Sequence, residues 1–257
     1  MIYWFTGQPS SGKTTLATLL VDYLEKSNKK VKHIDGDGLR ELTQNFDYTE
    51  EGRRKNITKA QDIALEFQLK GFEIVVSVVA PYLDLRENLK VKTSVLEFYT
   101  HTDEKRRKDL YKVLDYQKPI SDFIDLDTSK SIDECFAIIK NEIRIKNQYS
   151  MFIGRYQPLH KGHKWLFNER LKEGKNILIC VRDMIVDEKN PFSAKQVQKN
   201  IEQEYANLVT VGKVKVMIIP DIESINYGRG VGYQITEHKP PENIKQISAT
   251  KIRAKNK

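Results

Sequence analysis

The chain has 257 residues, of which 39% are hydrophobic and 30% charged, and its formal net charge is +8 at pH 7. This composition is typical of an ordinary globular protein, and the length can bury one large core or two small ones. No run approaches the roughly 18 consecutive apolar residues of a membrane span. The positive charge suits polyanionic ligands, but basic and acidic residues are mixed and no nucleic-acid-binding motif occurs, so we expect small-molecule partners.

The first residues form a predicted strand, without the basic and apolar regions of a signal peptide, so we expect a cytoplasmic protein. The two cysteines, Cys135 and Cys180, lie far apart and lack metal-ligand spacing. We therefore expect both to be buried, reduced thiols.

Apolar, β-rich segments alternate with helical ones in the first half of the chain, which is typical of an α/β fold with a parallel sheet. Strands are predicted at Ile2–Thr6, Val31–Ile34, Glu73–Val79 and Ser94–Thr100. Helices are predicted at Thr14–Lys26, Thr49–Leu69 and Leu83–Lys90. An acidic turn is expected at Asp35–Asp37, a polar loop at 116–121, and a later helix begins after its cap, Ser131.

The polar stretch Arg144–Ser150 has no apolar periodicity and is interpreted as the joint between two domains, residues 1–146 and 147–257. In the second domain, strands are predicted at Ser150–Ile153, Asn176–Val181 and Lys213–Ile219, and helices begin near Lys161 and Ser193. This domain is therefore expected to be a small, Rossmann-like α/β unit.

The segment GQPSSGKT, from Gly7 to Thr14, lies between the first predicted strand and helix and matches the pattern GxxxxGK[ST]. Glycines let the backbone curl so that N–H groups point at phosphate oxygens, and Lys13 neutralises the β- and γ-phosphates. The Thr14 hydroxyl is the predicted Mg²⁺ ligand, and the helix adds its positive N-terminus. The predicted nucleotide-binding residues are Gly7, Gln8, Pro9, Ser10, Ser11, Gly12, Lys13, Thr14 and Thr15.

Three later segments, HIDGDGLRELTQ, YTEEGRRKNITKAQDIA and IVVSVVAPYLDLRENL, follow in an order and spacing that resemble adenylylsulfate kinase. The resemblance covers roughly residues 1–145 and implies an ATP- and Mg²⁺-dependent kinase, from a family whose members commonly form homodimers. It implies that Asp37 orients or deprotonates the acceptor hydroxyl, which makes Lys13 and Asp37 the predicted catalytic residues. The implied substrate-binding residues are Asp35, Asp37, Arg40, Arg53, Asn56, Pro81 and Tyr82.

Departures from the family pattern fall on the acceptor side. Gly52 stands where the family usually has an aspartate, Thr58 and Lys59 stand where it has two arginines, and Ala80 stands where it has a serine. Leu83 replaces a basic residue, and the segment KDLYKVLDYQKPISDF matches the family's basic, aromatic lid only in part. ATP-dependent phosphorylation of a small-molecule hydroxyl is therefore expected, and the acceptor stays open.

A second motif, GRYQPLHKGH, runs from Gly154 to His163 after a predicted strand. His160 and His163 lie three residues apart at the start of a helix, so both rings face the same side. Gly162 leaves room for a triphosphate beside the helix N-terminus. The motif resembles the HxGH signature of the nucleotidyltransferase superfamily, in which a substrate phosphate attacks the α-phosphorus of a nucleoside triphosphate and pyrophosphate leaves.

Near the C-terminus, ISATKIR resembles the serine- and threonine-rich helix start with which that superfamily binds the β- and γ-phosphates. The alternative role for Ser248 or Thr250 is a helix cap. His160 and His163 are the predicted catalytic residues of the second domain. Its predicted nucleotide-binding residues are Gly154, Arg155, Tyr156, His160, His163, Ser248, Thr250 and Arg253.

The nucleotide of the second site is ATP or CTP, with Mg²⁺. GRYQPLHKGH, DEKNPFSAKQ and IPDIES together resemble archaeal-type nicotinamide-mononucleotide adenylyltransferases, whereas ISATKI is close to glycerophosphate cytidylyltransferases. Asp221 is either a substrate contact or a plain strand-end acid. The segment Tyr227–Tyr233 is either a base- or substrate-binding loop or a surface turn.

Together the motifs predict a bifunctional transferase, which phosphorylates a small-molecule hydroxyl and then transfers AMP or CMP onto the phosphorylated metabolite. The alternatives are an adenylylsulfate kinase of sulfate activation, a nicotinamide riboside kinase joined to a mononucleotide adenylyltransferase, and a nucleotide sensor without catalysis. The second domain is too short for a sulfurylase, and every phosphate-contacting residue that can be matched is intact. Both observations favour the bifunctional transferase.

Overall fold

A computed structural model describes residues 1–105, 112–228, 232 and 234–255 of the chain. The chain forms two compact units, Met1–Lys146 and Asn147–Lys257, and each is described by itself. Part of the lid-like segment (108–111) and part of the loop after Tyr227 (229–231 and 233) lie outside the described residues, as does the side chain of Lys251.

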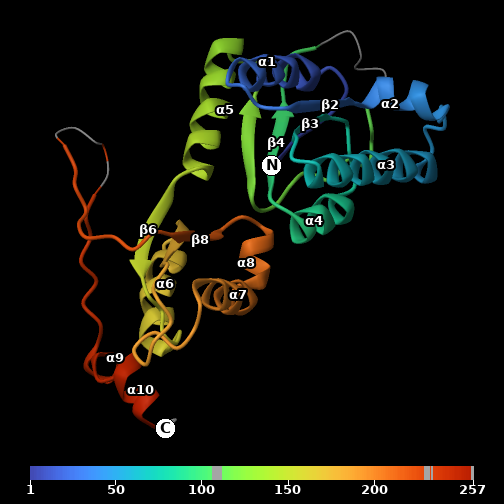
Figure 1. Ribbon diagram of the computed structural model, residues 1–257. Helices are drawn as coiled ribbons and strands as arrows, with labels where there is room; N and C mark the ends of the chain where they lie inside the picture. The colour runs from blue at the N-terminus through green and yellow to red at the C-terminus, as the bar shows by residue number, and fades with distance from the viewer. Residues whose placement is uncertain (106–111, 229–231, 233, 256–257) are drawn as a thin grey trace. The chain divides into compact units, whose positions relative to one another are not determined.

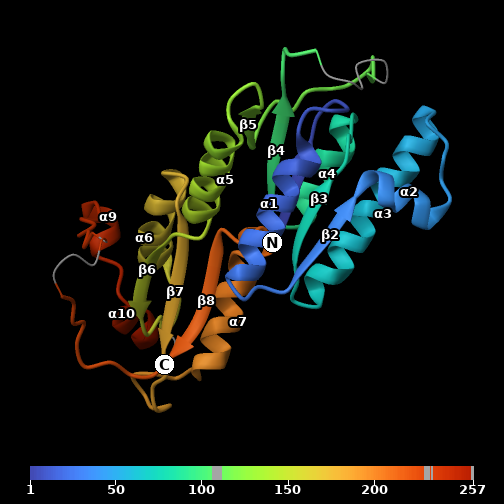
Figure 2. The ribbon, with the colours of Figure 1, turned by 90° about the horizontal axis from the view of Figure 1, so that it is seen from above.

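The first unit contains one parallel five-stranded sheet in the order β2-β3-β1-β4-β5 (Figures 1 and 2). Its strands are β1 (Ile2–Thr6), β2 (Val31–Asp35), β3 (Glu73–Ser77), β4 (Val95–His101) and β5 (Phe123–Asp127). Its helices are α1 (Lys13–Lys26), α2 (Gly36–Thr43), α3 (Glu50–Leu69), α4 (Leu83–Lys92) and α5 (Ile132–Lys146).

The central strand β1 explains why helices cover both faces of this sheet. All five of its residues are buried, and successive side chains of a strand point to opposite faces. Ile2 and Trp4 pack in one core with α3 and α4, whereas Tyr3 and Phe5 pack in another with α1 and α5. Figure 1 shows α1 and α3 on opposite sides of the sheet. Because β1 is buried on both faces, its sequence is a nearly unbroken run of apolar residues.

The parallel strands place their carboxyl ends along one edge of the sheet. The GQPSSGKT loop follows β1 there, Asp35 is the last residue of β2, and the segment leading to Pro81 follows β3. Ligands bind at this edge in open parallel sheets. The edge therefore carries the first candidate site.

One prediction for the first unit is wrong. Gly36–Thr43 forms α2 and not merely an acidic turn, because the Asp35 carboxylate accepts the N–H groups of Asp37 and Gly38 and caps the helix. The joint between the units is short, since α5 continues to Lys146 and leaves only two residues before the next strand. The sequence analysis also contains no prediction of β5, an edge strand with only one fully buried residue.

The second unit has a parallel three-stranded sheet in the order β6-β7-β8 (Figure 2). Its strands are β6 (Tyr149–Gly154), β7 (Asn176–Arg182) and β8 (Val214–Ile219). Its helices are α6 (Lys161–Lys172), α7 (Ala194–Glu204), α8 (Ala206–Thr210), α9 (Glu242–Lys245) and α10 (Ala249–Lys255). The predicted helix starts are confirmed, because α6 begins at Lys161 and Ser193 caps α7 through a capping box with Gln196.

The core of the second unit joins β7 to its flanking helices. Ile177 and Ile179 of β7 are fully buried against Phe167 of α6 and Ile201 of α7. Cys180 and, in the first unit, Cys135 are both buried and free of disulfides. Among the described helices, none is long and apolar enough for a membrane span.

Candidate active sites

The GQPSSGKT loop lies tightly against the end of β4. Gly7 has a φ of 147°, and a Cβ built on it would lie 2.1 Å from the carbonyl oxygen of Thr100. Ser11 Oγ hydrogen bonds Thr100 Oγ1 at 2.6 Å and fixes the loop to the same residue. Only glycine permits this approach at the first position of the motif.

Lys13 begins α1 and is only 7% exposed. Its Nζ donates to the carbonyl oxygens of Gly7 at 3.0 Å and Gln8 at 2.6 Å. These bonds hold the ammonium group within the loop, where polyphosphate oxygens can share or replace the two carbonyl acceptors. The position fits the predicted role of Lys13 at the phosphates.

Asp35 lies beside Thr14 at the end of β2. Its Oδ1 accepts hydrogen bonds from Thr14 Oγ1 at 3.1 Å and Ser77 Oγ at 2.9 Å, and its Oδ2 caps α2. Burial acts to raise the pKa of this carboxyl, but the hydrogen bonds together outweigh burial and the pKa lies below its usual value. Thr14 and Asp35 thus present neighbouring oxygen donors, which are the ligands that Mg²⁺ prefers.

His33 is linked to Asp35 through the hydroxyl of Ser77. Its Nε2 lies 3.0 Å from Ser77 Oγ, and burial lowers its pKa below the usual value. Because Ser77 already donates its proton to Asp35, the imidazole supplies the proton of the second bond. Sequence analysis did not identify His33 or Ser77, since neither belongs to a recognised motif.

A cavity of about 940 Å³ opens beside the phosphate loop. It brings together the following residues predicted from the sequence: Pro9, Ser10, Lys13, Thr14, Asp35, Asp37, Arg40, Arg53, Asn56 and Pro81. The further lining residues, which sequence analysis missed, include Phe46, Tyr48, Lys112 and Val113. Two aromatic residues in the polar loop NFDY were a signal that could have indicated the first pair.

Asn56 of α3 has an unsatisfied polar atom in this cavity. The residue is 6% exposed, and its Oδ1 is buried without a hydrogen-bond partner in the described part of the chain. A buried amide oxygen without a donor costs free energy, so a ligand that supplies an N–H or O–H group gains affinity here. Asn56 therefore remains a strong candidate for acceptor binding.

Two predicted acceptor contacts are placed differently by the structure. Arg40 Nη1 donates to the carbonyl oxygens of Asn45 at 2.9 Å and Asp47 at 2.8 Å, and its guanidinium lies 4.3 Å from the centre of the Tyr48 ring. Arg40 therefore holds the loop between α2 and α3. Tyr82 is 2% exposed and does not line the cavity, so Pro81 alone forms the predicted wall.

Gly52 has a structural reason to depart from the family's aspartate. A Cβ at this position would lie 2.4 Å from both the carboxyl carbon and the carbonyl oxygen of Asp47. The loop between α2 and α3 therefore approaches α3 too closely for any side chain at Gly52.

The HxGH motif of the second unit places two histidine rings in contact. His160 caps α6, and its Nδ1 accepts the N–H of Gly162 at 3.1 Å, which leaves the ring proton on Nε2. The ring of His163 stacks on it with centroids 3.8 Å apart. Burial lowers the pKa of both rings, and burial with the neighbouring His160 brings that of His163 to about 4. Both imidazoles are therefore neutral at pH 7.

Other motif residues position His163. Tyr156 has a φ of 51° and is 5% exposed, and its ring meets His163 edge-on with centroids 5.0 Å apart. A Cβ on Gly154 would lie 2.8 Å from the Tyr156 ring. His163 Nδ1 is buried and has no hydrogen-bond partner within the described residues. Tyr156 thus packs against the ring of His163, and Gly154 packs against Tyr156. Arg155 is exposed.

Three segments distant in sequence meet at Gln157. Its Nε2 donates to the carbonyl oxygen of Phe192 at 2.6 Å, and its Oε1 accepts the N–H of Phe192 at 3.1 Å. Its own carbonyl accepts Arg253 Nη1 from α10, and Arg253 Nη2 donates to Thr250 Oγ1 at 3.3 Å. The structure therefore brings the C-terminal motif to the HxGH loop.

Two remaining predictions concern polar residues of the second unit. Asp221 follows β8 and accepts Arg182 Nε at 2.7 Å. Ser248 precedes α10 and its carbonyl accepts the N–H of Ile252 at 3.1 Å, as expected at a helix start.

The first part of the chain is similar to known adenylyl-sulfate kinases. Residues 1–118 match the family described as adenylylsulphate kinase. The probable adenylyl-sulfate kinase of Archaeoglobus fulgidus is 38% identical over 87 residues, which are 34% of this chain and 56% of that protein. The corresponding protein of Aeropyrum pernix is 34% identical over 91 residues, which are 35% of this chain and 50% of that protein. The chain thus spans about half the length of these curated relatives.

Two further matches extend beyond that region. The cytidine diphosphoramidate kinase of Campylobacter jejuni is 28% identical over 150 residues, which are 56% of this chain and 87% of that protein. A solved structure of the Mycobacterium tuberculosis APS kinase CysC, in complex with AMPPNP and APS, covers 56% of this chain and 96% of its own. It matches with a TM-score of 0.51 at 22% identity, which shows a shared α/β fold.

Proposed function

We propose that the chain is a bifunctional transferase and that its first unit transfers the γ-phosphoryl group of ATP to a hydroxyl of a nucleotide-like acceptor. The observation that carries this proposal is the cavity of about 940 Å³, which joins the phosphate loop to Asp37, Arg53 and Asn56. A hydrolase needs only the phosphate side of such a cavity. Its acceptor side, with the orphaned Asn56 Oδ1, favours a kinase.

In this kinase the chain positions two reactants in line. The acceptor oxygen attacks the γ-phosphorus, the bond from that phosphorus to the β–γ bridging oxygen breaks, and ADP leaves. Asp37 accepts the hydroxyl proton, and Lys13 stabilises charge on the phosphate oxygens. Thr14 and Asp35 would hold Mg²⁺, which supplies charge neutralisation at the β- and γ-phosphates when bound.

The names of the relatives favour an acceptor that is itself a nucleotide derivative. Adenylyl-sulfate and cytidine diphosphoramidate each consist of a nucleotidyl group joined to a small inorganic acid. The match to the cytidine diphosphoramidate kinase is the longer one, and it favours a cytidine derivative. The match of residues 1–118 to the adenylylsulphate kinase family favours the second candidate, adenylyl-sulfate.

For the second unit the proposed reaction is nucleotidyl transfer. A phosphate-type oxygen of the substrate attacks the α-phosphorus of ATP or CTP, the bond to the α–β bridging oxygen breaks, and pyrophosphate leaves. The N–H groups of neutral His160 and His163 would donate to phosphate oxygens at the start of α6.

An acceptor of this kind changes the order of the two reactions. The sequence alone predicts phosphorylation first and nucleotidyl transfer second. A kinase acceptor that already carries a nucleotidyl group must be made by nucleotidyl transfer, so the second unit would act first. This order is a consequence of the chemistry of the acceptors named above.

A substrate screen tests both reactions. The full chain is incubated with Mg²⁺ and ATP or CTP, and ADP and pyrophosphate are measured separately. Adenylyl-sulfate, cytidine diphosphoramidate and nicotinamide riboside are offered as kinase acceptors, and inorganic phosphate, phosphoramidate and nicotinamide mononucleotide as nucleotidyl acceptors. ADP formation that requires one of the nucleotide derivatives supports the kinase assignment. ADP formation at the same rate without any acceptor would instead identify an ATPase.

A further inference from the structure

Gln8, the second residue of the phosphate loop, binds a segment far along the chain. Its Nε2 donates to the carbonyl oxygen of Val113 at 2.9 Å, and its Oε1 accepts the N–H of Val113 at 2.9 Å. A primary amide matches the backbone donor and acceptor of one residue in this way. Val113 is 5% exposed, so Gln8 satisfies backbone groups that water reaches poorly.

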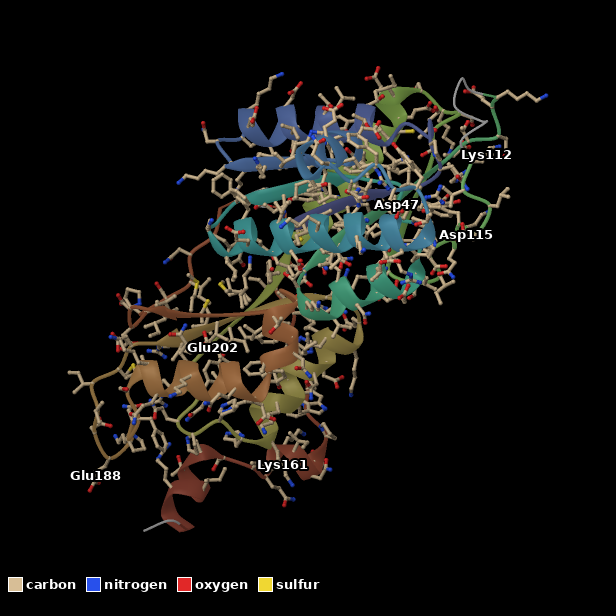
Figure 3. All side chains as sticks on the ribbon, turned by 90° about the vertical axis from the view of Figure 1, so that its right-hand side faces the viewer. Asp47, Lys112, Asp115, Lys161, Glu188 and Glu202 are labelled. Atoms are coloured by element: carbon tan, nitrogen blue, oxygen red, sulfur yellow. The ribbon has the colours of Figure 1, made fainter. Side chains whose placement is uncertain are left out.

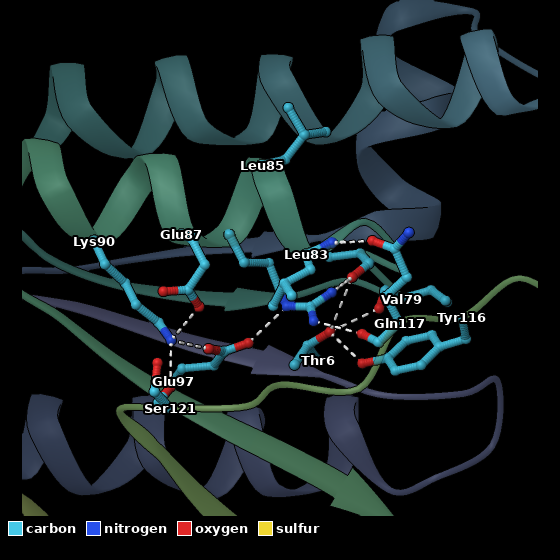
Figure 4. Close-up of polar contacts among 12 residues, drawn as sticks. Thr6, Val79, Leu83, Leu85, Glu87, Lys90, Glu97, Tyr116, Gln117 and Ser121 are labelled. Atoms are coloured by element: carbon cyan, nitrogen blue, oxygen red, sulfur yellow. Dashed lines mark hydrogen bonds and ion pairs between the residues drawn. The ribbon is translucent and has the colours of Figure 1, made fainter.

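Val113 belongs to a segment, residues 112–118, that we name the strap. Its other end is fixed at the segment after β3, where Gln117 N donates to Pro81 O at 2.9 Å and Gln117 Oε1 accepts Leu83 N at 2.8 Å. In its middle, Tyr116 Oη and Thr6 Oγ1 lie 2.7 Å apart. Figure 4 shows the contact of Gln117 with Leu83 and that of Tyr116 with Thr6 at the end of β1.

A buried ionic group fixes that far end of the strap. Arg86 of α4 donates to the carbonyl oxygens of Ala80 and Gln117 and forms a 2.8 Å ion pair with Glu97 of β4. Lys90 contacts the second oxygen of Glu97 at 2.5 Å. The side chains of Arg86 and Glu97 are each 1% exposed. Breaking such a buried pair is costly, so Arg86 is a firm attachment for this end of the strap (Figure 4).

The strap forms one wall of the cavity between its phosphate side and its acceptor side. Lys112 and Val113 line the cavity, and Asp115 lies 4.0 Å from Arg53 of α3. Figure 3 shows Lys112 and Asp115 at the same end of the first unit as Asp47, which lies in the loop between α2 and α3. A displacement of Val113 would therefore move groups that face the acceptor.

From these contacts we infer that Gln8 is a positioning residue for the acceptor, although it lies in the phosphate loop. Its amide fixes the cavity end of the strap, and thereby Lys112 and Asp115, relative to the phosphate loop. Ionic contacts hold the far end, so loss of the amide frees only the cavity end. The inference rests on the proposed kinase reaction.

The test separates acceptor binding from ATP binding and from folding. Gln8→Leu removes both hydrogen bonds, and Gln8→Glu keeps an acceptor for Val113 N–H but no donor for its carbonyl. Gln203→Leu, at an exposed position in the second unit, is the matched control. KM for ATP and for adenylyl-sulfate or cytidine diphosphoramidate is measured in each variant. Hydrogen exchange of residues 112–118 is measured alongside.

We expect Gln8→Leu to raise the acceptor KM about tenfold, because one to two net hydrogen bonds are lost, and to change the ATP KM by less than the acceptor KM. Exchange at Val113 should rise while exchange in β1 and β4 stays unchanged, and Gln8→Glu should lie between wild type and Gln8→Leu. Equal changes in both KM values, or an unchanged acceptor KM beside faster exchange, would overturn the inference. Failure of the wild-type chain to phosphorylate any acceptor would instead overturn the proposed function, whereas the exchange data would still report whether Gln8 holds the strap.

Discussion

The two units offer phosphate different kinds of hydrogen-bond donor. In the first unit, two loop carbonyls hold the ammonium group of Lys13 in place. In the second, His160 and His163 stack as neutral rings, because burial lowers the pKa of each. A charged group binds the polyphosphate before and during reaction, whereas neutral N–H donors act at short range on oxygens whose charge is developing. The first arrangement suits γ-phosphoryl transfer, and the second suits attack at the α-phosphorus.

Both units nevertheless use glutamine in the same structural way. In each motif a Gln-Pro pair places a side-chain amide against the backbone of a distant residue, Val113 for Gln8 and Phe192 for Gln157. The difference is burial, since Gln157 is 4% exposed and also accepts Arg253 through its carbonyl. Gln157 therefore joins three segments of its unit, whereas Gln8 fixes one wall of the cavity, the strap.

The sharpest test of the comparison is to remove one phosphate-binding side chain at a time. Lys13→Ala should lower phosphoryl transfer by about 10³-fold or more and leave nucleotidyl transfer intact, because an electrostatic contact to the transition state is lost in one unit only. His163→Ala should do the reverse. ADP and pyrophosphate release report the two reactions separately. If either change removed both activities from a folded chain, the two-site model would fail.

The next largest effect concerns the close approach at Gly52. Gly52→Ala places a methyl group where Asp47 already lies 2.4 Å away, so the loop between α2 and α3 must shift. We expect a loss of about 1–3 kcal/mol in unfolding free energy and a higher acceptor KM. Gly38→Ala is the matched control, because its Cβ would meet nothing within 4 Å and α2 should gain about 0.5–1 kcal/mol. Urea titration of both variants decides the point, and equal stabilities would show that the loop moves freely.

Sequence analysis found the features that local patterns specify and missed those that depend on distant contacts. Continuous apolar runs predicted β1, and spacing predicted the pairing of His160 with His163, because each signal lies within a few residues. The helix α2 depends on the Asp35 cap, whose second role is a bond to Ser77 from another strand. The link from Gln8 to Val113 joins residues 105 positions apart, and no local pattern predicts it.

The same limit applies to the assignment of roles. The sequence placed Arg40 at an acceptor phosphate, and the residue lines the cavity, but its Nη1 is already bound to the carbonyls of Asn45 and Asp47. It placed Tyr82 in the acceptor wall, whereas the ring is buried in the core. A motif gives residue types at a spacing, but only packing decides which side chains remain available to a ligand.

A smaller effect is expected on the stability of the second unit, which should depend on pH through His163. His163 has a pKa of about 4 in the folded chain and an ordinary value near 6.5 when unfolded. Between these values the unfolded chain binds more protons, so stability falls as pH falls from about 6.5 towards 4. We expect about 1–2 kcal/mol from His163 after screening is allowed for, and a flatter profile in His163→Asn. Hydrogen exchange of β7 between pH 7 and 4.5 measures it, and identical profiles would contradict the neutral ring.

The smallest expected effect tests the acid of the first unit. Ser77→Ala removes one hydrogen bond from Asp35 Oδ1 and leaves those from Thr14 and the start of α2. The pKa of Asp35 should rise towards its usual value, yet the carboxylate stays ionised at neutral pH because that value is itself near 3.8. Any loss of affinity for Mg²⁺·ATP must then come from an altered position of the Asp35 carboxylate. We expect Mg²⁺·ATP to bind about three- to tenfold more weakly. Calorimetric titration at pH 6 and 8 should give the same loss at both pH values. A loss confined to the lower pH would mean that Ser77 acts on the protonation of Asp35, and the first unit would then share the pH dependence that the comparison assigns to the second.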